Sequence, residues 1–116
     1  MGYAIPSSKQ KVQPVITCFI RYEIDPFRRE DFVQYSRVWG EAIPRCGADL
    51  VGYFAPHEGS ATVGYGVYNI ESLAAYEAYR ARLAADPEGR ANYEFAAGRR
   101  FITREDRMFL KRVDIR

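Results

Sequence analysis

The sequence predicts an α+β domain of the ferredoxin-like plan, a βαββαβ subunit with an extra helix before the last strand. Three observations predict it. A strand-like run at residues 15–24 is followed by an Asp-Pro helix start. Two further strand-like runs are joined by a short segment rich in turn residues. Two more helix starts then precede a last strand-like run. At 116 residues, the chain is about one domain long.

The first strand, VITCFIRYEI, carries apolar side chains on both faces. Successive side chains of a strand point to opposite faces, so a strand with one wet face alternates apolar and polar residues. Arg21 is the one positive charge on this strand, and it either meets an acidic group or an anionic ligand, or reaches solvent near the strand end. The two rows are Ile16, Cys18, Ile20, Tyr22 and Ile24, and Val15, Thr17 and Phe19.

A helix is expected to begin at Asp25-Pro26. Aspartate accepts hydrogen bonds from the free N–H groups of a first turn, and proline at the first helical position gives up no hydrogen bond. Pro44 and Gly47 are expected to end the helix. Apolar residues recur between these signals at spacings of three and four, which is typical of one buried helix face. These residues are Phe32, Tyr35, Trp39 and Ile43.

Residues 48–55 and 61–70 are predicted to form an antiparallel hairpin. The connecting segment, PHEGS, contains the turn residues that such a hairpin needs. Glycine weakens a strand, so Gly52, Gly64 and Gly66 indicate a bulge or the close approach of another group to the backbone.

Two consecutive helices and a strand complete the plan. Asp86-Pro87 repeats the capping pattern and predicts a third helix that extends towards Ile102. The run RMFLKRV, residues 107–113, predicts the last strand. The second helix starts at about Ser72, and its inward residues are expected to be Leu73, Tyr76, Tyr79 and Leu83.

The second apolar face of the sheet predicts an assembly. In this plan both main helices cover the same face of the sheet, and the other face is bare within one subunit. Each exposed valine or phenylalanine there forgoes roughly 1.5 to 3 kcal/mol of burial. A two-fold pairing of two sheets removes that face from water. We therefore expect a homodimer that pairs through the sheet face.

Composition and charge argue against several classes of protein. A net charge of +2, with basic residues scattered along the chain, argues against a nucleic-acid groove or a membrane-binding face. No segment approaches the length of a membrane span, and residues 1–14 lack the features of a signal or transit peptide. We expect these residues to form a flexible tail before a single domain at residues 15–116.

The two cysteines, Cys18 and Cys46, lie far apart and form no CxxC motif. Both are expected to be structural, because reactive thiols need an electropositive and open environment. Their presence suits a reducing compartment, so we expect a cytoplasmic protein.

A family resemblance rests on three segments, CFIRYEIDPF, RCGADLVGYFAPHEG and IESLAAYEAYRARLAADPEGR. They resemble the NIPSNAP family of the dimeric α/β-barrel superfamily, and the resemblance extends over nearly all of residues 15–113. It implies a ferredoxin-like subunit that pairs its sheets into a dimeric α/β barrel. The family has no agreed reaction, and its members are described in vesicle traffic and mitochondrial quality control.

Ligands of this superfamily typically lie between the helices and the sheet, so the resemblance implies a cleft there. An aromatic lining suits a small apolar or aromatic ligand. The alternative is that the aromatic residues fill the core, as periodic aromatic residues usually do. The expected lining residues are Tyr22, Trp39, Tyr65 and Tyr76.

Charged and titratable residues add few candidates. His57 is the only histidine and lies in the predicted hairpin loop beside Glu58, where it is either a ligand-binding or proton-transfer residue or an ordinary loop residue. Glu77 and Arg80 have the spacing of a weak ion pair on a helix. The helices contain no histidine to hold haem, and the sequence has no metal-ligand cluster or phosphate-binding glycine loop. No cofactor and no metal are therefore expected.

Three functions remain open at this point. The first is a NIPSNAP-like binding or interaction module without catalysis, which the missing acid–base set favours. The second is a small-molecule enzyme, such as a cofactor-independent monooxygenase, that uses the aromatic cleft. The third is a structural dimer without a pocket. An open cavity among the four aromatic residues would favour the second function.

Overall fold

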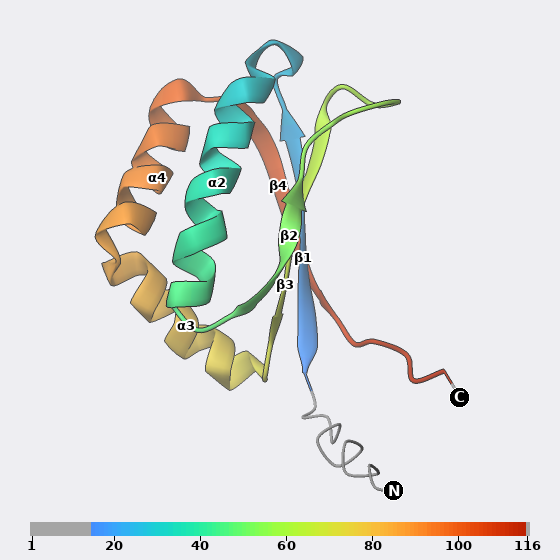
Figure 1. The fold of residues 1–116 in the computed structure, drawn as a ribbon, viewed down its shortest axis with the longest axis vertical. Coiled ribbons are helices and arrows are strands. Elements are labelled where there is room, and N and C mark those ends of the chain that lie inside the picture. Colours follow the sequence, from blue (N-terminus) through green and yellow to red (C-terminus); the bar gives the residue numbers. More distant parts are fainter. Residues whose placement is uncertain (1–14, 116) are drawn as a thin grey trace, which may run out of the picture.

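The computed structural model describes residues 15–115 and has the predicted α+β, ferredoxin-like architecture. Its four strands form one antiparallel sheet in the order β2-β3-β1-β4. The α-helices lie on one face of this sheet, and no helix of residues 15–115 lies on the opposite face (Figure 1). In chain order the elements are β1 (Ile16–Ile24), the 3-10 helix η1 (Pro26–Arg28), α2 (Arg29–Arg45), β2 (Asp49–Phe54), β3 (Val63–Ile70), α3 (Leu73–Ala85), α4 (Pro87–Arg99) and β4 (Ile102–Leu110). The expected tail at residues 1–14 lies outside the described residues.

The helix starts are capped as the sequence predicts. The Asp25 carboxylate accepts a hydrogen bond from the Phe27 N–H at 2.9 Å, and the chain turns there into η1. The Asp86 carboxylate accepts from the Gly89 N–H at 2.9 Å at the start of α4. The Ser72 hydroxyl accepts from the Ala75 N–H at the start of α3. These caps satisfy N–H groups that have no partner within the helix.

Helix α2 ends at Arg45, between Pro44 in its last turn and Gly47, which has a positive φ of 109°, as the sequence predicts. Two other predicted element limits are wrong. Helix α4 ends at Arg99 instead of extending towards Ile102, because Arg100 takes a left-handed conformation (φ 55°) that closes the helix. The last strand accordingly begins at Ile102, five residues earlier than predicted. Leu73 is 58% exposed because it is the first residue of α3, and the buried stripe of that helix starts one turn later.

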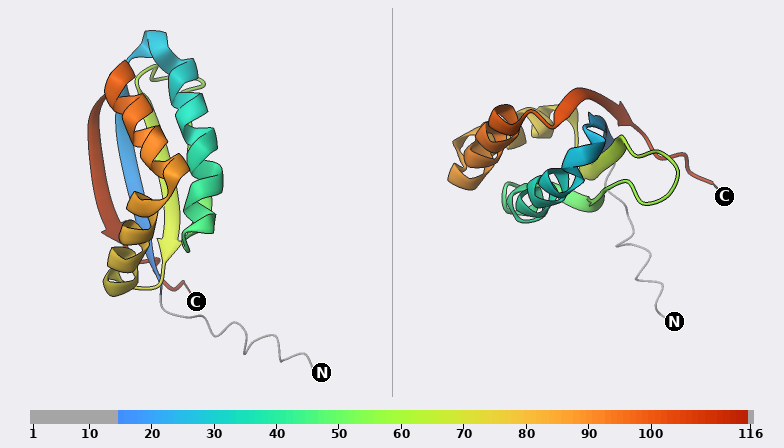
Figure 2. Two further views of the ribbon diagram at one scale, coloured as in Figure 1. Left: turned by 90° about the vertical axis from the view of Figure 1, so that its left-hand side faces the viewer. Right: turned by 90° about the horizontal axis from the view of Figure 1, so that it is seen from above.

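The core lies between the helical layer and the sheet. One row of β1 faces the helices, and four of its five residues are at most 2% exposed, namely Cys18, Ile20, Tyr22 and Ile24. The predicted stripe of α2 packs against this row and is buried throughout. Helix α4 lies beside α2, as the turned views in Figure 2 show. The buried side chain of Asn92 links these two helices, because its Nδ2 donates to the Tyr35 carbonyl oxygen at 3.0 Å.

The glycines of the hairpin have the predicted roles. Gly64 and Gly66 of β3 lie opposite Tyr22 and Ile20 of β1, so they face the helical layer. A Cβ atom at Gly66 would lie 2.5 Å from the Tyr53 ring, and one at Gly64 would lie 2.7 Å from the Phe32 ring. Both glycines therefore leave room for aromatic rings above the sheet. The pairing of β2 with β3 shifts between Leu50 and Gly52, which is the expected bulge.

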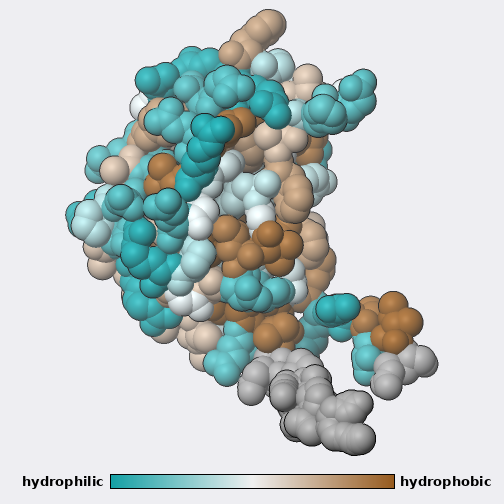
Figure 3. Space-filling model, in the orientation of Figure 1, coloured by the Kyte–Doolittle hydropathy of each residue, from teal (hydrophilic) through white to brown (hydrophobic). Residues whose placement is uncertain are grey.

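The helix-free face of the sheet is partly apolar. Its polar end includes Arg21, whose guanidinium lies 3.3 Å from the Glu23 carboxylate, so this charge has an acidic partner on the same face. Hydrophobic residues are visible where β2 and β3 run and on the segment after β4 (Figure 3). We use the name apolar sheet face for the exposed or half-buried residues Val15, Phe19, Phe54, Tyr65, Met108 and Leu110. Within residues 15–115, no helix has the length and apolar character to cross a membrane.

Candidate functional site

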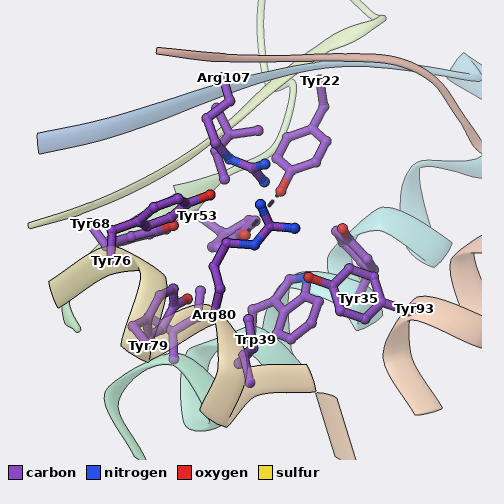
Figure 4. Close-up of a pocket in the computed structure, with 13 residues that line it drawn as sticks. Tyr22, Tyr35, Trp39, Tyr53, Tyr68, Tyr76, Tyr79, Arg80, Tyr93 and Arg107 are labelled. Atoms are coloured by element: carbon purple, nitrogen blue, oxygen red, sulfur yellow. Dashed lines mark hydrogen bonds between the residues drawn. The ribbon is translucent and has the colours of Figure 1, made fainter. Parts of the chain in front are cut away.

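A small cavity lies between the helical layer and the sheet (Figure 4). Its volume is about 30 Å³, which is room for roughly two water molecules. Strands β1, β2, β3 and β4 and helices α2, α3 and α4 all contribute to its lining. Besides Trp39, two arginines and three aliphatic residues, the lining consists of Tyr22, Tyr35, Tyr53, Tyr68, Tyr76, Tyr79 and Tyr93. We call it the tyrosine cavity.

A pair of tyrosines on the sheet forms one wall of the tyrosine cavity. The hydroxyl oxygens of Tyr22 and Tyr53 lie 3.0 Å apart and share a hydrogen bond. The Tyr22 ring packs edge-on against Phe32, with the ring centroids 5.2 Å apart. Edge-to-face packing of this kind adds to the stability that burial provides. The position of the Tyr22 hydroxyl is thus fixed by both its hydrogen bond and the ring packed against it.

Trp39 of α2 forms the opposite wall. Its ring packs edge-on against Tyr35 and Tyr93, at centroid distances of 5.6 and 5.1 Å. Tyr93 belongs to α4 and is exposed, so the cavity reaches the surface beside this residue. Trp39 therefore connects the buried end of the cavity with its opening.

The phenol groups of the cavity are held in their protonated form. Burial raises the pKa of Tyr35 to about 12 and raises the pKa values of Tyr22 and Tyr53 well above their usual range. Burial also raises the pKa of Tyr68 and Tyr79. At neutral pH each of these hydroxyl groups has a proton to donate.

Two arginines enter the cavity from opposite layers. Arg107 comes from β4, where its Nη2 donates to the Glu105 carboxylate at 2.8 Å. Burial disfavours the charged guanidinium, but nearby Tyr76 and Glu105 act in the other direction and the pKa of Arg107 is raised. Arg80 comes from α3, and its guanidinium carbon lies 5.7 Å above the centre of the Tyr76 ring. The predicted Glu77–Arg80 ion pair does not form in the structure.

Three of the five predicted site residues line the tyrosine cavity. They are Tyr22, Trp39 and Tyr76. The prediction that Tyr65 lines the cleft is wrong. Tyr65 lies opposite Arg21 in the sheet and is 39% exposed on the helix-free face, because the two glycines beside it occupy the face that meets the helices. His57 is exposed in the loop between β2 and β3 and does not line the cavity.

The sequence pattern does not identify several of the lining residues. Tyr35 and Tyr79 were expected to be buried, but nothing in their helical spacing separates a residue that fills the core from one that borders a cavity. Tyr53 lies on the same face of the sheet as Gly66, and that pairing depends on the register of β2 with β3. Arg107 lies opposite Ile20, which places it on the helix side of β4.

Both cysteines are buried and unpaired with one another. Burial raises the pKa of the Cys18 and Cys46 thiols. Both thiols therefore stay protonated at neutral pH and have little nucleophilic character. This agrees with the structural role expected for them.

The fold and the tyrosine cavity define a ferredoxin-like α+β protein with an aromatic cavity between its helices and its sheet. The NIPSNAP family model matches residues 17–115, so the chain belongs to the NIPSNAP family. None of the curated proteins matches the chain significantly by sequence.

Solved structures agree with this fold. A NIPSNAP family protein of unknown function from Agrobacterium tumefaciens is 20% identical, with a TM-score of 0.73, over 87% of this chain and 90% of that chain. An uncharacterized NIPSNAP-like domain protein from Burkholderia xenovorans is 23% identical, with a TM-score of 0.71, over 90% of both chains. A putative antibiotic biosynthesis monooxygenase from Caulobacter crescentus is 12% identical, with a TM-score of 0.65, over 88% of this chain and 92% of that chain. At these identities the similarity shows the fold alone.

Proposed function

We propose that the protein is a homodimeric binding module that holds a small apolar or aromatic molecule in the tyrosine cavity. The observation that carries this proposal is the cavity itself, an aromatic-walled space that reaches the surface between two packed layers. Clefts lined by aromatic side chains with a few polar groups are the usual form of small-molecule sites. The two buried free thiols suit a reducing environment, so the proposed location is the cytoplasm.

The apolar sheet face supports the dimer. Phe19 pairs in register with Val67 on one side and Met108 on the other, so three apolar residues lie side by side across three strands of this face. Met108 is 47% exposed and Phe54, on the outer strand, is also exposed. A second copy placed sheet to sheet would bury these residues and leave the helical layer and the tyrosine cavity free.

The chemistry of the lining favours binding over catalysis. Among the described residues, those that border the cavity include tyrosines, Trp39 and two arginines, but no carboxylate and no histidine. The buried phenols keep their protons at neutral pH, and so does the Arg107 guanidinium. The lining thus supplies hydrogen-bond donors but no group ready to accept a proton from a substrate.

The cavity volume limits what can be buried completely. A space of about 30 Å³ accepts one small group of a ligand, since roughly two water molecules fill it. The remainder of the ligand would lie at the opening, where Arg80 and Tyr93 are exposed. A ligand of this kind has a compact end inside the cavity and an aromatic or apolar body against Tyr93.

The second candidate function is a cofactor-independent monooxygenase or another small-molecule enzyme. The structural similarity to a putative antibiotic biosynthesis monooxygenase favours it, because that protein has the same architecture. Oxygen uptake with a reduced polyphenol such as 1,4-dihydroxynaphthalene tests this function directly. A rate proportional to enzyme concentration and abolished by Trp39→Phe would replace the binding module with the enzyme.

Native mass spectrometry of protein purified from its own host tests the proposed function. The expected result is a dimer that carries a bound small molecule, with a mass that identifies the ligand class. A dimer without a ligand would retain the assembly and contradict the binding role of the cavity. A monomer would contradict the pairing through the apolar sheet face.

A further inference from the structure

We propose that Arg80 and Arg107 form an anion subsite that holds the carboxylate group of a small acidic ligand in the tyrosine cavity. This inference rests on the proposed binding function and specifies the chemical class of its ligand. It follows from the two guanidinium groups, the donor character of the lining, and the size of the cavity.

The two guanidinium groups border one cavity although they belong to different layers. Arg107 extends from β4 and Arg80 from α3, and both line the same space of about 30 Å³ (Figure 4). Both charges also act on Tyr93. Burial raises the pKa of Tyr93, and the positive charges of Arg107 and Arg80 act against that increase. The opening of the cavity is therefore positively charged next to an aromatic ring.

These charges are only partly compensated. Among the described residues, Arg107 has one carboxylate partner, Glu105, and that carboxylate is itself about one-third exposed. No carboxylate within residues 15–115 lies within ion-pair distance of Arg80, which instead stacks over the Tyr76 ring. Two positive charges and one negative charge leave this opening with a net positive charge. An anionic group is the ligand that such an opening attracts.

The interior of the cavity presents donors to the same ligand. The Tyr22 and Tyr53 hydroxyls carry their protons, and only one of the two is used in the hydrogen bond between them. The other hydroxyl proton and the N–H groups of both arginines are further hydrogen-bond donors at the cavity. A carboxylate has two oxygen atoms with about four acceptor positions and is planar, which matches the fork of a guanidinium. A carboxylate group is also small enough to enter a cavity that holds roughly two water molecules.

The test compares benzoate with benzamide, a neutral molecule of nearly the same shape. Trp39 is the only tryptophan of the chain and lines the cavity, so its fluorescence reports binding at this site. We expect benzoate to change Trp39 emission saturably and to bind about tenfold or more tightly than benzamide, since hydrogen bonds to charged groups are worth that factor.

Variants assign the effect to the two arginines. Arg80→Gln and Arg107→Gln should each weaken benzoate binding about tenfold and leave benzamide binding unchanged. Arg90→Gln is the matched control. It removes the same single positive charge, but Arg90 is exposed on α4 and does not line the cavity. Arg80 is exposed, so its replacement leaves the core intact and decides the test even if the Arg107 variant fails to fold.

The outcomes separate this inference from the proposed function. Equal affinity for benzoate and benzamide would overturn the anion subsite and leave an aromatic binding cavity in place. Equal losses of benzoate affinity in the Arg80 and Arg90 variants would also overturn the anion subsite, because the affinity would then depend only on the net charge of the protein. No fluorescence response to either probe at millimolar concentration would overturn both the subsite and the proposed binding of small aromatic molecules.

Discussion

The hydrogen bond between Tyr22 and Tyr53 joins two strands that are not neighbours in the sheet. Strand β3 runs between them, and it places Gly64 opposite Tyr22 and Gly66 opposite Tyr53. The two rings thus meet above a part of β3 that has no side chains. The same rings form the sheet-side wall of the tyrosine cavity, so the glycines of β3 determine the shape of the site.

Tyr53→Phe is expected to lower the free energy of unfolding by about 1 kcal/mol. The substitution removes one partner of the hydrogen bond and leaves the buried Tyr22 hydroxyl without it. Tyr22→Phe should have a similar effect, and the double variant should be little worse than either single one. Urea unfolding of the four proteins measures this coupling. Strictly additive losses would mean that the two hydroxyls do not interact.

Gly66→Ala is expected to destabilise the protein by about 1 to 3 kcal/mol, as overpacking does in well-packed cores. The new Cβ would lie 2.5 Å from the Tyr53 ring, which is itself held between β2 and the helical layer. The matched control is Gly40→Ala inside α2, where a Cβ meets nothing within 4 Å. That change should stabilise the protein by about 0.5 to 1 kcal/mol, because alanine favours helix. Equal effects of the two substitutions would contradict the close approach at Gly66.

The sequence was sufficient for most of the fold because the local signals agree with one another. Apolar periodicity located the buried row of β1 and the stripe of α2, and the Asp-Pro pairs located two helix starts. The end of α4 was missed, since a left-handed arginine has no sequence signal comparable to a C-terminal glycine. The strand after it was placed too late because residues 104–107 are all charged, and charge of this kind protects an edge strand from pairing with other chains.

The site was harder to predict than the fold, and β3 shows why. Its sequence, VGYGVYNI, has apolar residues at both parities, so alternation alone does not reveal which face meets the helices. Tyr65 was placed on the wrong face for this reason. The correct face is the one with the two glycines. Only the Tyr53 and Phe32 rings, which come from other elements, explain why positions 64 and 66 on that face have no side chain.

The protein is expected to lose stability as pH rises above 10. The pKa of Tyr35 is about 12 in the folded state, compared with an ordinary value of 10.0, because its phenol is buried. Between these pH values the unfolded chain releases this proton while the folded chain retains it. The free energy of the unfolded state therefore falls relative to that of the folded state. Ionisation of Tyr35 alone lowers the free energy of unfolding by about 3 kcal/mol as pH rises from 10 to 12 and beyond. Its full stabilising contribution is present below pH 10.

Urea unfolding at a series of alkaline pH values measures this effect, with absorbance near 295 nm reporting tyrosinate. Tyr35→Phe should make the fall in stability with pH less steep, because one group with a raised pKa is absent. An identical pH dependence in the variant would mean that the Tyr35 phenol ionises equally in the folded and unfolded chain.

Met108→Glu is expected to convert the proposed dimer into a folded monomer. Met108 is 47% exposed within one subunit, so a glutamate there meets water and costs the subunit little. In a sheet-to-sheet dimer the same carboxylate would be buried beside Phe19 without a positive partner at its register position, which is unfavourable by several kcal/mol. Sedimentation velocity at micromolar concentration distinguishes the two species.

Leu73→Glu provides the matched control, since Leu73 is 58% exposed at the start of α3, away from the sheet. If both variants remain dimeric, the protein pairs through another surface; if both become monomeric, added charge alone explains the change.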